Sequence, residues 1–385
     1  MIKIHFRKIP QVDVVVFDES NSNVLSSVID TKLSTFVLKT RALDIWINPS
    51  VLLNFLRTIK EFNYAQAKCY KKGIILGALK ECLIVYLKSC ILTINPRGVI
   101  TYTDNCEKFS RLSTTCKQFE FIAVQNGTRL QFQMPKSQIY SPSHLFCFGF
   151  HEKQILPKHG AINTKFYPSG SLAMDFFRTA NVERQNNRFD ILIVSCWRGN
   201  INLGQEVQDT MAAMRSADYE IAHYINTRKL RVGVILRSER NSEHWMMPEI
   251  GMTEEEYFLT IYGSKIEIID NNFKERPIVD LIFQSELILS GGPTSALLEA
   301  FGYGKKILYC DYSHDKKYFL DMDRSIKYTK NNNTTLSSIL DNLLKQPNES
   351  YVLEHADLIN YYMTVPENES TTQLIKKTIS SILSI

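Results

Sequence analysis

The sequence predicts an α/β protein made of two Rossmann-like domains that face each other across a cleft. Short apolar runs alternate with helical patterns along nearly the whole chain, and these runs come in two groups. The 385 residues exceed the usual size of a single domain. We therefore expect two parallel sheets, each with helices around it and with its own core.

The expected strands alternate with helices within each group. The first group of strands comprises VDVVVFD, GVITYTD, FEFIAVQ and HLFCFGF, and the second comprises FDILIVSC, LRVGVILR, KIEIID, LILS and KILYC. Helical patterns occur around residues 24–33, 50–60 and 73–90, and again near residues 203–227, 253–262, 278–284 and 294–301. This alternation is typical of parallel sheets, because each crossover between parallel strands needs a helix.

The link between the two groups of strands places the domain boundary. The segment from 164 to 188 joins the last strand of one group to the first strand of the next. We expect a first domain over residues 1–165, a second over residues 166–365 and a C-terminal helix over residues 366–385. The final segment, PENESTTQLIKKTISSILSI, starts with helix-capping residues and continues with an amphipathic pattern. We expect this helix to pack back on the first domain.

The composition favours a cytoplasmic protein. A net charge of +5 spread along the chain argues against dedicated nucleic-acid binding, but suits anionic ligands or a loose, peripheral membrane association. The eight cysteines include no C-x-x-C pair, which favours reduced thiols over disulfides or zinc. The most apolar stretch, Ile75 to Ile94, carries Lys80, Glu81 and Lys88, which favours a packed helix over a membrane span. Any membrane association would then be at the inner face of the cytoplasmic membrane.

A glycine-rich stretch near the C-terminus predicts a phosphate-binding turn. SELILSGGPTSALLEAFGYGKKILYCD, residues 285 to 311, indicates a strand, a turn, a helix and a second strand. Gly291 and Gly292 would let a ligand approach the backbone, and the helix start adds free N–H groups and the Thr294 and Ser295 hydroxyls. An ordinary turn with a Thr or Ser helix cap is the alternative.

Eight segments, taken in order, resemble a known family. They are FDESNSNVL, VITYTDN, FIAVQNGTR, FCFGFHEKQIL, FYPSGSLAMDFF, DILIVSCWR, VILRSER and SGGPTSALLEAFGYGKKILYCD. Together, over roughly residues 10 to 320, they resemble the bacterial surface-carbohydrate biosynthesis proteins. Those proteins are similar to GT-B glycosyltransferases, and more remotely to the capsule and O-antigen enzymes that transfer Kdo, a ketodeoxyoctulosonic acid, from its CMP conjugate.

This resemblance implies that the second domain binds a nucleotide donor, usually without a metal. Gly291, Gly292, Thr294 and Ser295 would hold the donor phosphate at the helix start. Glu299, one helical turn further on, would accept hydrogen bonds from the ribose hydroxyls. A solvated helix residue is the alternative for Glu299.

Basic residues that follow two strands would complete the donor site. The segment VILRSER places Arg237, Ser238 and Arg240 just past a strand end, as in a phosphate-binding motif of related enzymes. Arg198 in SCWR follows another strand. Arginine can pair bidentately with a phosphate or a sugar carboxylate. The sequence lacks the His-Pro that many relatives carry near VILRSER, and a surface arginine beside Trp197 is the alternative for Arg198.

The first domain offers candidate catalytic residues. Asp104 ends a strand in TYTDN, where a carboxylate would act as a base toward the acceptor hydroxyl or as a nucleophile toward the anomeric carbon. A helix-capping aspartate is the alternative. His151 and Glu152 in GFHEK are further acid–base candidates, although a lone histidine is more often structural.

Two further motifs bear on the acceptor side of the expected cleft and on metal binding. The segment AVQNGTR places Gln125, Asn126 and Gly127 at a strand end on the acceptor side, with a plain Asn-Gly turn as the alternative. The segment DMD at 321 to 323 matches a metal-binding D-x-D pattern only superficially, because it follows the last clear strand. We therefore expect neither a metal nor a cofactor.

These features favour a glycosyltransferase that moves a sugar from a nucleotide donor to a glycan or lipid-linked acceptor of a growing bacterial surface polysaccharide. A CMP-ulosonic acid such as CMP-Kdo would suit several arginines and no metal, with UDP and GDP sugars as the alternatives. Two other functions stay open: a non-hydrolysing nucleotide-sugar epimerase, and a non-catalytic subunit of a glycan-assembly complex.

Overall fold

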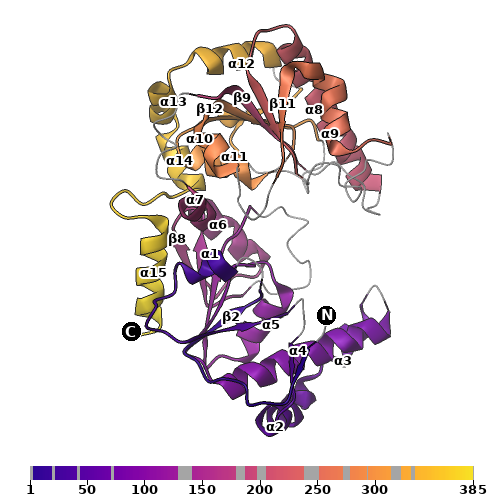
Figure 1. Ribbon diagram of the computed structural model, residues 1–385, viewed down its shortest axis with the longest axis vertical. Helices are drawn as coiled ribbons and strands as arrows, with labels where there is room; N and C mark the ends of the chain where they lie inside the picture. The colour runs from indigo at the N-terminus through magenta and orange to yellow at the C-terminus, as the bar shows by residue number, and fades with distance from the viewer. Residues whose placement is uncertain are drawn as a thin grey trace.

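The protein consists of two parallel-sheet α/β units, seen one above the other in Figure 1. The computed structural model describes residues 3–19, 22–40, 44–70, 73–128, 141–178, 187–196, 205–237, 251–271, 278–292, 294–313, 322–330 and 334–384. Within these residues each unit has a sheet of six strands, and every neighbouring pair in both sheets is parallel. The predicted fold class is confirmed.

The first sheet has the strand order β3-β2-β5-β6-β7-β8. Its strands are β2 (Val14–Phe17), β3 (Thr35–Leu38), β5 (Gly98–Thr101), β6 (Glu120–Val124), β7 (His144–Cys147) and β8 (Lys165–Pro168). The boundary predicted after residue 165 therefore falls within β8, which pairs with β7. A separate pair, β1 (Lys3–His5) and β4 (Asp44–Trp46), lies outside this sheet.

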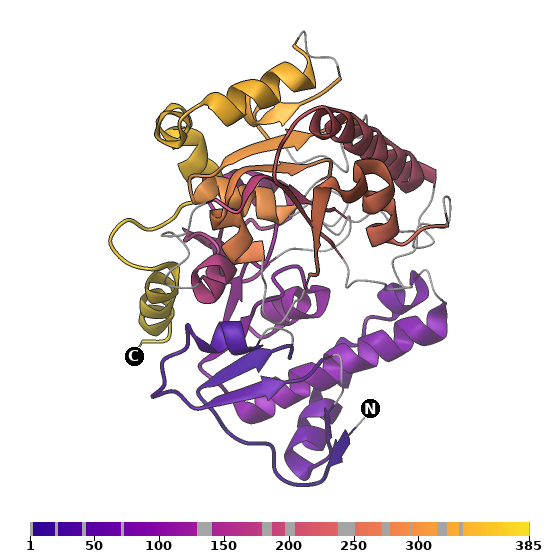
Figure 2. The same ribbon diagram turned by 45° about the horizontal axis from the view of Figure 1, so that its top comes forward.

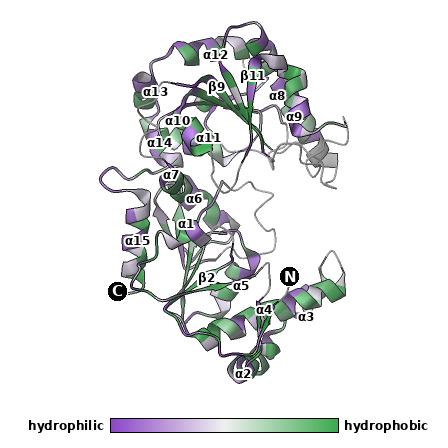
Figure 3. Cartoon of the chain, in the orientation of Figure 1, coloured by the Kyte–Doolittle hydropathy of each residue, from purple (hydrophilic) through white to green (hydrophobic). Residues whose placement is uncertain are grey.

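Alternating residues of the first sheet build two cores on its two faces, as the period of a strand requires. Val15 and Phe17 of β2 belong to one core and Val14 and Val16 to the other. The first core also contains residues of α2 (Pro49–Thr58), α4 (Ile74–Ile94) and α5 (Glu107–Thr115). The second contains residues of α1 (Ser22–Ser26), α7 (Leu172–Phe177) and α15 (Thr371–Ile382). Hydrophobic residues, green in Figure 3, run along the strands of both sheets.

The stretch from Ile75 to Ile94 lies within the 21-residue helix α4, which packs beside α2 and α3 (Tyr64–Lys68). Its charges are paired inside the protein: Glu81 accepts two hydrogen bonds from Arg111, each of 2.6 Å. Lys88 donates to Glu61 and to the Thr115 carbonyl. In the part of the chain that the structure describes, no helix is both long and apolar enough to cross a bilayer.

The second sheet has the strand order β11-β10-β9-β12-β13-β14. Its strands are β9 (Phe189–Val194), β10 (Val232–Ile235), β11 (Ile266–Ile269), β12 (Ser285–Ser290), β13 (Lys306–Cys310) and β14 (Lys327–Tyr328). The helices of this unit are α8 (Gln205–Asn226), α9 (Glu254–Tyr262), α10 (Ile278–Phe283), α11 (Ser295–Gly302), α12 (Leu336–Lys345), α13 (Asn348–Glu354) and α14 (Ala356–Tyr362).

The end of the chain returns to the first unit. A capping box between Ser370 and Gln373 starts α15. Ile375 and Ile379 of this helix, with Leu383 just past its end, are buried in the second core of the first sheet. Figures 1 and 2 both show α15 beside the lower unit, after the chain has left the upper one.

Candidate active site

The carboxyl ends of β7 and β8 in the first sheet adjoin the second unit. The hydroxyl of Ser171, just past β8, donates to Glu299 Oε1 of α11 at 2.7 Å. After β7, the Phe148 carbonyl accepts a hydrogen bond from the Thr364 N–H at 2.8 Å. Figure 1 shows α6 (Phe150–Ile155) and α7 meeting α11 and α14 at this junction. Ligands of open α/β folds bind beyond the carboxyl ends of the strands, so we place the candidate active site at these edges.

Asp104 lies past the carboxyl end of β5 and is almost fully buried, with 1% of its surface exposed. Its Oδ1 accepts a hydrogen bond from the Asn126 N–H, past the end of β6, at 3.2 Å. Asp104 does not cap the next helix, because the N-cap of α5 is Cys106. The structure thus brings together Asp104 and Asn126, two residues singled out in the sequence.

Gln125 and Glu152 form a buried network at the same edge. The Gln125 side-chain amide donates to the Gly127 carbonyl at 3.0 Å and to Glu152 Oε1 at 3.1 Å. Its own oxygen accepts from the Phe148 N–H at 2.8 Å. Glu152 Oε2 accepts from the Gly149 N–H at 3.1 Å, at the start of α6. These bonds hold the turns after β6 and β7 in place. Gln125 and Glu152 therefore position the backbone near Asp104.

His151 points toward α14 of the second unit. Its ring packs against Tyr361 and Tyr362, with centroid distances of 5.6 and 5.2 Å. Its Nδ1 lies 3.9 Å from Glu152 Oε1. Its Nε2 is buried and has no hydrogen-bond partner among the described residues. The ring therefore packs at the junction between the two units.

The turn after β12 is compact and tied to β9. The Gly292 N–H donates to the Ser290 hydroxyl at 3.2 Å, and that oxygen lies 2.8 Å from the Val194 carbonyl. A Cβ at Gly292 would lie 2.5 Å from Cys196 Cβ, which leaves room only for glycine. Gly291 is buried beside it. Glycine at position 292 therefore allows this turn to pack closely against the segment that follows β9.

Thr294 and Ser295 begin α11 and are both half-buried. Thr294 is the N-cap, and its Oγ1 accepts a hydrogen bond from the Ala296 N–H at 3.3 Å. This is the capping role that the sequence left open as the alternative. Capping uses the oxygen as an acceptor, so the hydroxyl can still donate its hydrogen to a ligand.

Glu299 is buried in the second turn of α11, with 7% of its surface exposed. Its Oε1 accepts the hydrogen bond from Ser171, whose oxygen also caps α7 by accepting from the Met174 N–H at 3.3 Å. Burial raises the pKa of the nearby Tyr303, and the charges of Asp175 and Glu299 raise this pKa further. Glu299 is therefore not a solvated helix residue, because it binds the segment that connects the two units.

Arg237 follows β10 and is exposed. Its backbone N–H lies 3.0 Å from both carboxylate oxygens of Glu254. Its carbonyl accepts a hydrogen bond from the Asn271 side chain at 3.3 Å. The other predicted basic cluster, with Arg198, Ser238 and Arg240, lies outside the described residues.

Glu254 is a residue at this edge that the sequence did not single out. It is buried, it opens α9, and it also accepts a hydrogen bond from the Ser195 hydroxyl past the end of β9. Its carboxylate thus links the carboxyl ends of β9 and β10. The capping box of Thr253 and Glu256 marks the helix start in the sequence, but it does not show which glutamate turns inward.

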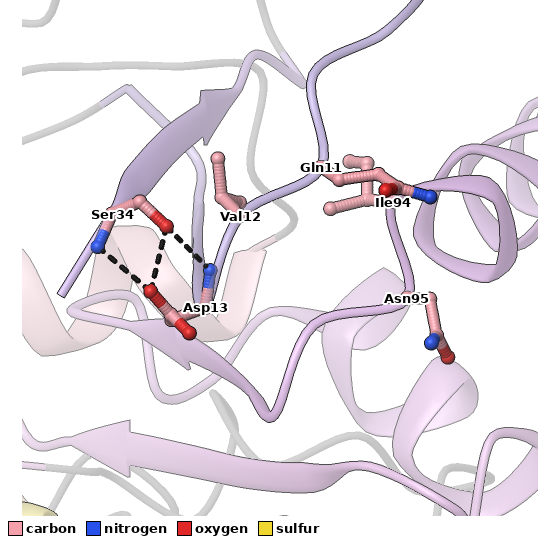
Figure 4. Close-up of a pocket in the computed structure, with 6 residues that line it drawn as sticks. All are labelled: Gln11, Val12, Asp13, Ser34, Ile94 and Asn95. Atoms are coloured by element: carbon pink, nitrogen blue, oxygen red, sulfur yellow. Dashed lines mark hydrogen bonds between the residues drawn. The ribbon is translucent and has the colours of Figure 1, made fainter.

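A shallow pocket of about 260 Å³ lies at the opposite edge of the first sheet (Figure 4). Its lining residues precede β2 and β3 or end α4: Gln11, Val12, Asp13, Ser34, Ile94 and Asn95. Asp13 Oδ2 accepts bonds from the Ser34 N–H at 3.0 Å and the Ser34 hydroxyl at 2.7 Å. We do not place the site here, because ligands of parallel sheets bind at the carboxyl ends of the strands.

In the part of the chain that the structure describes, no three His, Cys, Asp or Glu side chains gather as metal ligands. Of the D-x-D pattern, residue 321 lies outside the described residues. Asp323 accepts two bonds of 2.8 Å from Ser325, which lower the pKa of its carboxyl. Asp323 therefore serves a local turn.

No family model and no curated protein matches this sequence. Among solved structures, the chain is similar to UDP-N-acetylglucosamine 2-epimerase from Rickettsia bellii, at 11% identity and a TM-score of 0.51, over 100% of this chain and 96% of that one. It also aligns with spinosyn forosaminyltransferase SpnP, at 9% identity and a TM-score of 0.48, over 97% of this chain and 99% of that one. These likenesses concern the fold alone. The fold is thus that of an α/β protein with two parallel-sheet, Rossmann-like domains, and it is similar to the fold of that epimerase.

Proposed function

We propose that the protein is a nucleotide-sugar-dependent glycosyltransferase. The observation that carries this proposal is that both sheets have suitable residues at the carboxyl ends of their strands. The second unit has a glycine turn followed by the Thr294-capped start of α11, and the first has the buried carboxylate of Asp104 past the carboxyl end of β5, in the same sheet whose β7 and β8 ends contact the second unit. The turn suits a phosphate, and the carboxylate suits a reacting hydroxyl or anomeric carbon.

In the proposed reaction the second unit binds the donor. The N–H groups at the start of α11, the Thr294 and Ser295 hydroxyls and the Arg237 guanidinium would hold the donor phosphate. Arg198, Ser238 and Arg240 belong to the same proposal through the sequence alone. Glu299 Oε2, which accepts no bond from the described residues, would accept one from a ribose hydroxyl.

The first unit would then activate the acceptor. In an inverting reaction Asp104 takes the proton of the acceptor hydroxyl as that oxygen bonds to the anomeric carbon. The bond between the anomeric carbon and the phosphate oxygen breaks, and its electron pair leaves with the nucleotide. In a retaining reaction Asp104 would instead attack the anomeric carbon as the nucleotide leaves with the electron pair of the broken bond; the acceptor oxygen would then displace the Asp104 carboxylate and lose its proton to water. Gln125, Asn126 and Glu152 would keep the turn around Asp104 in place.

The donor and acceptor classes rest on the sequence resemblance. We propose a CMP-ulosonic acid such as CMP-Kdo as donor, because its single phosphate and its carboxylate both suit arginine. The acceptor would be a glycan or lipid-linked chain of a bacterial surface polysaccharide, reached from the cytoplasmic face of the membrane. UDP and GDP sugars are the alternative donors.

A non-hydrolysing nucleotide-sugar epimerase is the second candidate, because the fold is similar to that of a UDP-N-acetylglucosamine 2-epimerase. An epimerase would need more acid–base groups than Asp104. Two neighbours at the same edge are engaged elsewhere: Glu152 in hydrogen bonds with Gln125 and Gly149, and His151 in packing against α14. This arrangement favours transfer over epimerisation.

Product analysis separates these functions. The purified full chain is incubated with CMP-Kdo, and separately with UDP-N-acetylglucosamine, and the products are resolved by mass spectrometry and chromatography. Release of free nucleotide and sugar supports a transferase, and an altered sugar still attached to its nucleotide supports an epimerase. If neither appears while nucleotide binds, the chain is a non-catalytic subunit.

Metal removal tests how the donor phosphate is held. Since helix N–H groups and arginine would neutralise its charge, nucleotide release should persist in EDTA at nearly the untreated rate. The measurement is the initial rate before and after chelation. Loss of turnover that magnesium or manganese restores would contradict this account of the phosphate site.

A further inference from the structure

Exposed apolar side chains are concentrated in one segment of the first unit, which runs from α2 to the first turns of α4. Of the 17 large hydrophobic residues that are exposed among the described residues, nine lie between positions 52 and 79. They are Leu52, Leu53, Leu56, Ile59, Tyr64, Ile74, Ile75, Leu76 and Leu79, with exposed fractions from 37% to 73%. Such a concentration on a folded chain is typical of an interaction surface.

These residues belong to helices that pack side by side. Asn54 of α2 donates to Thr93 of α4 at 2.9 Å, and Thr58 shares a 3.0 Å bond with Ser89. A Cβ on Gly77 of α4 would lie only 2.2 Å from the Ala67 carbonyl of α3, so these two helices are in close contact. We call residues 49–70 and 73–80 the apolar arm; α3 and α4 extend to one side of the lower unit in Figures 1 and 2.

The apolar arm also carries positive charge. It contains four basic residues, Arg57, Lys60, Lys68 and Lys80, against one acidic residue, Glu61. Glu61 pairs with Lys88 at 2.5 Å, outside the arm. Arg57, Lys60 and Lys68 are exposed and form no ion pair within the described residues. Exposed aliphatic side chains among unpaired cations suit an anionic lipid surface.

One end of the apolar arm, the start of α4, lies beside the candidate active site. Lys80 pairs with Glu107, the first residue of α5, and Arg111 of α5 binds Glu81 of α4. The helix α5 begins just after Asp104 at the carboxyl end of β5. The exposed first turns of α4 therefore adjoin the edge at which an acceptor would react.

We propose that the apolar arm docks on an anionic membrane surface and so holds the carboxyl edge of the first sheet next to a lipid-linked acceptor. The acceptor part of this inference rests on the proposed transferase function, and the docking does not. A second copy of the chain fits this surface less well, because two arms with an excess of positive charge would repel each other.

Vesicle flotation with the full chain tests the docking. The vesicles contain phosphatidylcholine alone or with about 30% phosphatidylglycerol. We expect the chain to float with the anionic vesicles and to dissociate in about 0.5 M salt, where charges are screened. The variant Ile75→Ser with Leu79→Ser, exposed by 73% and 61%, should bind roughly tenfold more weakly.

A matched control removes equally exposed side chains elsewhere. Ile162→Ser with Leu353→Ser, exposed by 78% and 81%, should float as the unchanged chain does. Equal flotation of the arm variant, or no binding of the unchanged chain to anionic vesicles, would overturn the proposal. So would a dimer that the arm variant dissociates, because a second copy would then cover the arm.

A nucleotide measurement in the same samples keeps the two proposals apart. The arm variant should retain the melting-temperature rise that a bound nucleotide gives, since its substitutions leave the donor edge unchanged. Vesicle binding without any nucleotide effect would contradict the transferase and leave the docking intact. A rise in melting temperature with nucleotide but no vesicle binding would contradict the docking and leave the transferase intact.

Discussion

The first sheet has one aspartate near the amino ends of its strands, Asp13, and one near their carboxyl ends, Asp104, and both accept hydrogen bonds from the backbone. We call these two ends of the sheet its amino edge and its carboxyl edge. At the amino edge, Asp13 accepts bonds from the Ser34 backbone and hydroxyl, which hold the pKa of this partly exposed carboxyl below its usual value. At the carboxyl edge, Asp104 accepts a bond from the Asn126 backbone and is almost fully buried. Both aspartates join neighbouring strands of the sheet.

What separates these two aspartates is their position. Asp104 lies past the carboxyl end of β5, at the end of the sheet where the segments after β7 and β8 contact the second unit, whereas Asp13 lines a shallow pocket at the opposite end. A hydrogen bond to the backbone therefore does not distinguish a structural carboxylate from a catalytic one. We propose a catalytic role for Asp104 because of the end of the sheet at which it lies, and Asp13 at the opposite end provides the test.

The largest expected effect is on turnover, from Asp104→Asn. Asparagine keeps an oxygen for the Asn126 N–H but removes the basic and nucleophilic carboxylate. Turnover should therefore fall by about two orders of magnitude or more, while nucleotide affinity and melting temperature barely change. The rate of nucleotide release and the donor affinity are both measured.

The control for this variant is Asp13→Asn at the amino edge. It should keep normal turnover and lose at most about 1 kcal/mol of unfolding free energy, the worth of a hydrogen bond. If Asp104→Asn turned over as fast as Asp13→Asn, Asp104 would not be the catalytic group. The search would then move to His151 and Glu152.

A smaller effect, on nucleotide affinity, is expected from replacing the glycine after β12 in the second sheet. Gly292→Ala would place a Cβ 2.5 Å from Cys196 Cβ, so the turn after β12 must shift. We expect nucleotide affinity to fall by about tenfold and stability by about 1–3 kcal/mol.

Gly98→Ala at the start of β5 gives the matching control. Its Cβ would meet the Leu383 side chain at 2.7 Å, at the amino edge of the first sheet. This variant should lose stability and keep its nucleotide affinity. Equal loss of affinity in both variants would show that the assay reports general unfolding. Calorimetric titration and thermal melting give the two quantities.

The smallest expected effect is on the pH dependence of stability, through His144 at the start of β7. Burial lowers the pKa of His144, although its bond of 2.9 Å to Glu120 opposes this. A lowered folded pKa means that His144 stabilises the fold above its unfolded pKa of about 6.5, and that this contribution is lost as the pH falls. Between pH 7.5 and 5.5 the melting temperature should fall a few degrees less in His144→Gln than in the unchanged chain. An identical fall would contradict the assignment.

The central strands were predictable and some edge strands were not. The strands β2 (VVVF) and β9 (FDILIV) are nearly continuous apolar runs, because both faces of a central parallel strand are covered. The edge strand β3 (TFVL) buries only one of its four residues, and β8 (KFYP) buries none. Because these strands are exposed, they mix polar and apolar residues. They therefore lack the continuous apolar run from which the other strands were predicted.

The candidate site was predictable only where a residue follows an apolar run. Asp104 follows the last residue of β5 by three positions and Gly292 follows that of β12 by two, so their place near the carboxyl ends of these strands could be inferred from the sequence. The bond between Ser171 and Glu299 joins residues 128 positions apart, and it depends on how the two units pack. The inward turn of Glu254 likewise depends on β9 and β10 being neighbours.

Nucleotide binding at the start of α11 tests the central claim most directly. The melting temperature of the full chain is measured with CMP, CDP, UDP and GDP, and then with Thr294→Ala and Ser295→Ala combined. We expect at least one nucleotide to raise the melting temperature of the unchanged chain, and the double variant to lose most of that rise. Without ligand, the variant should lose only about 1 kcal/mol for the missing cap. An equal rise in both proteins, or none with any nucleotide, would contradict the account.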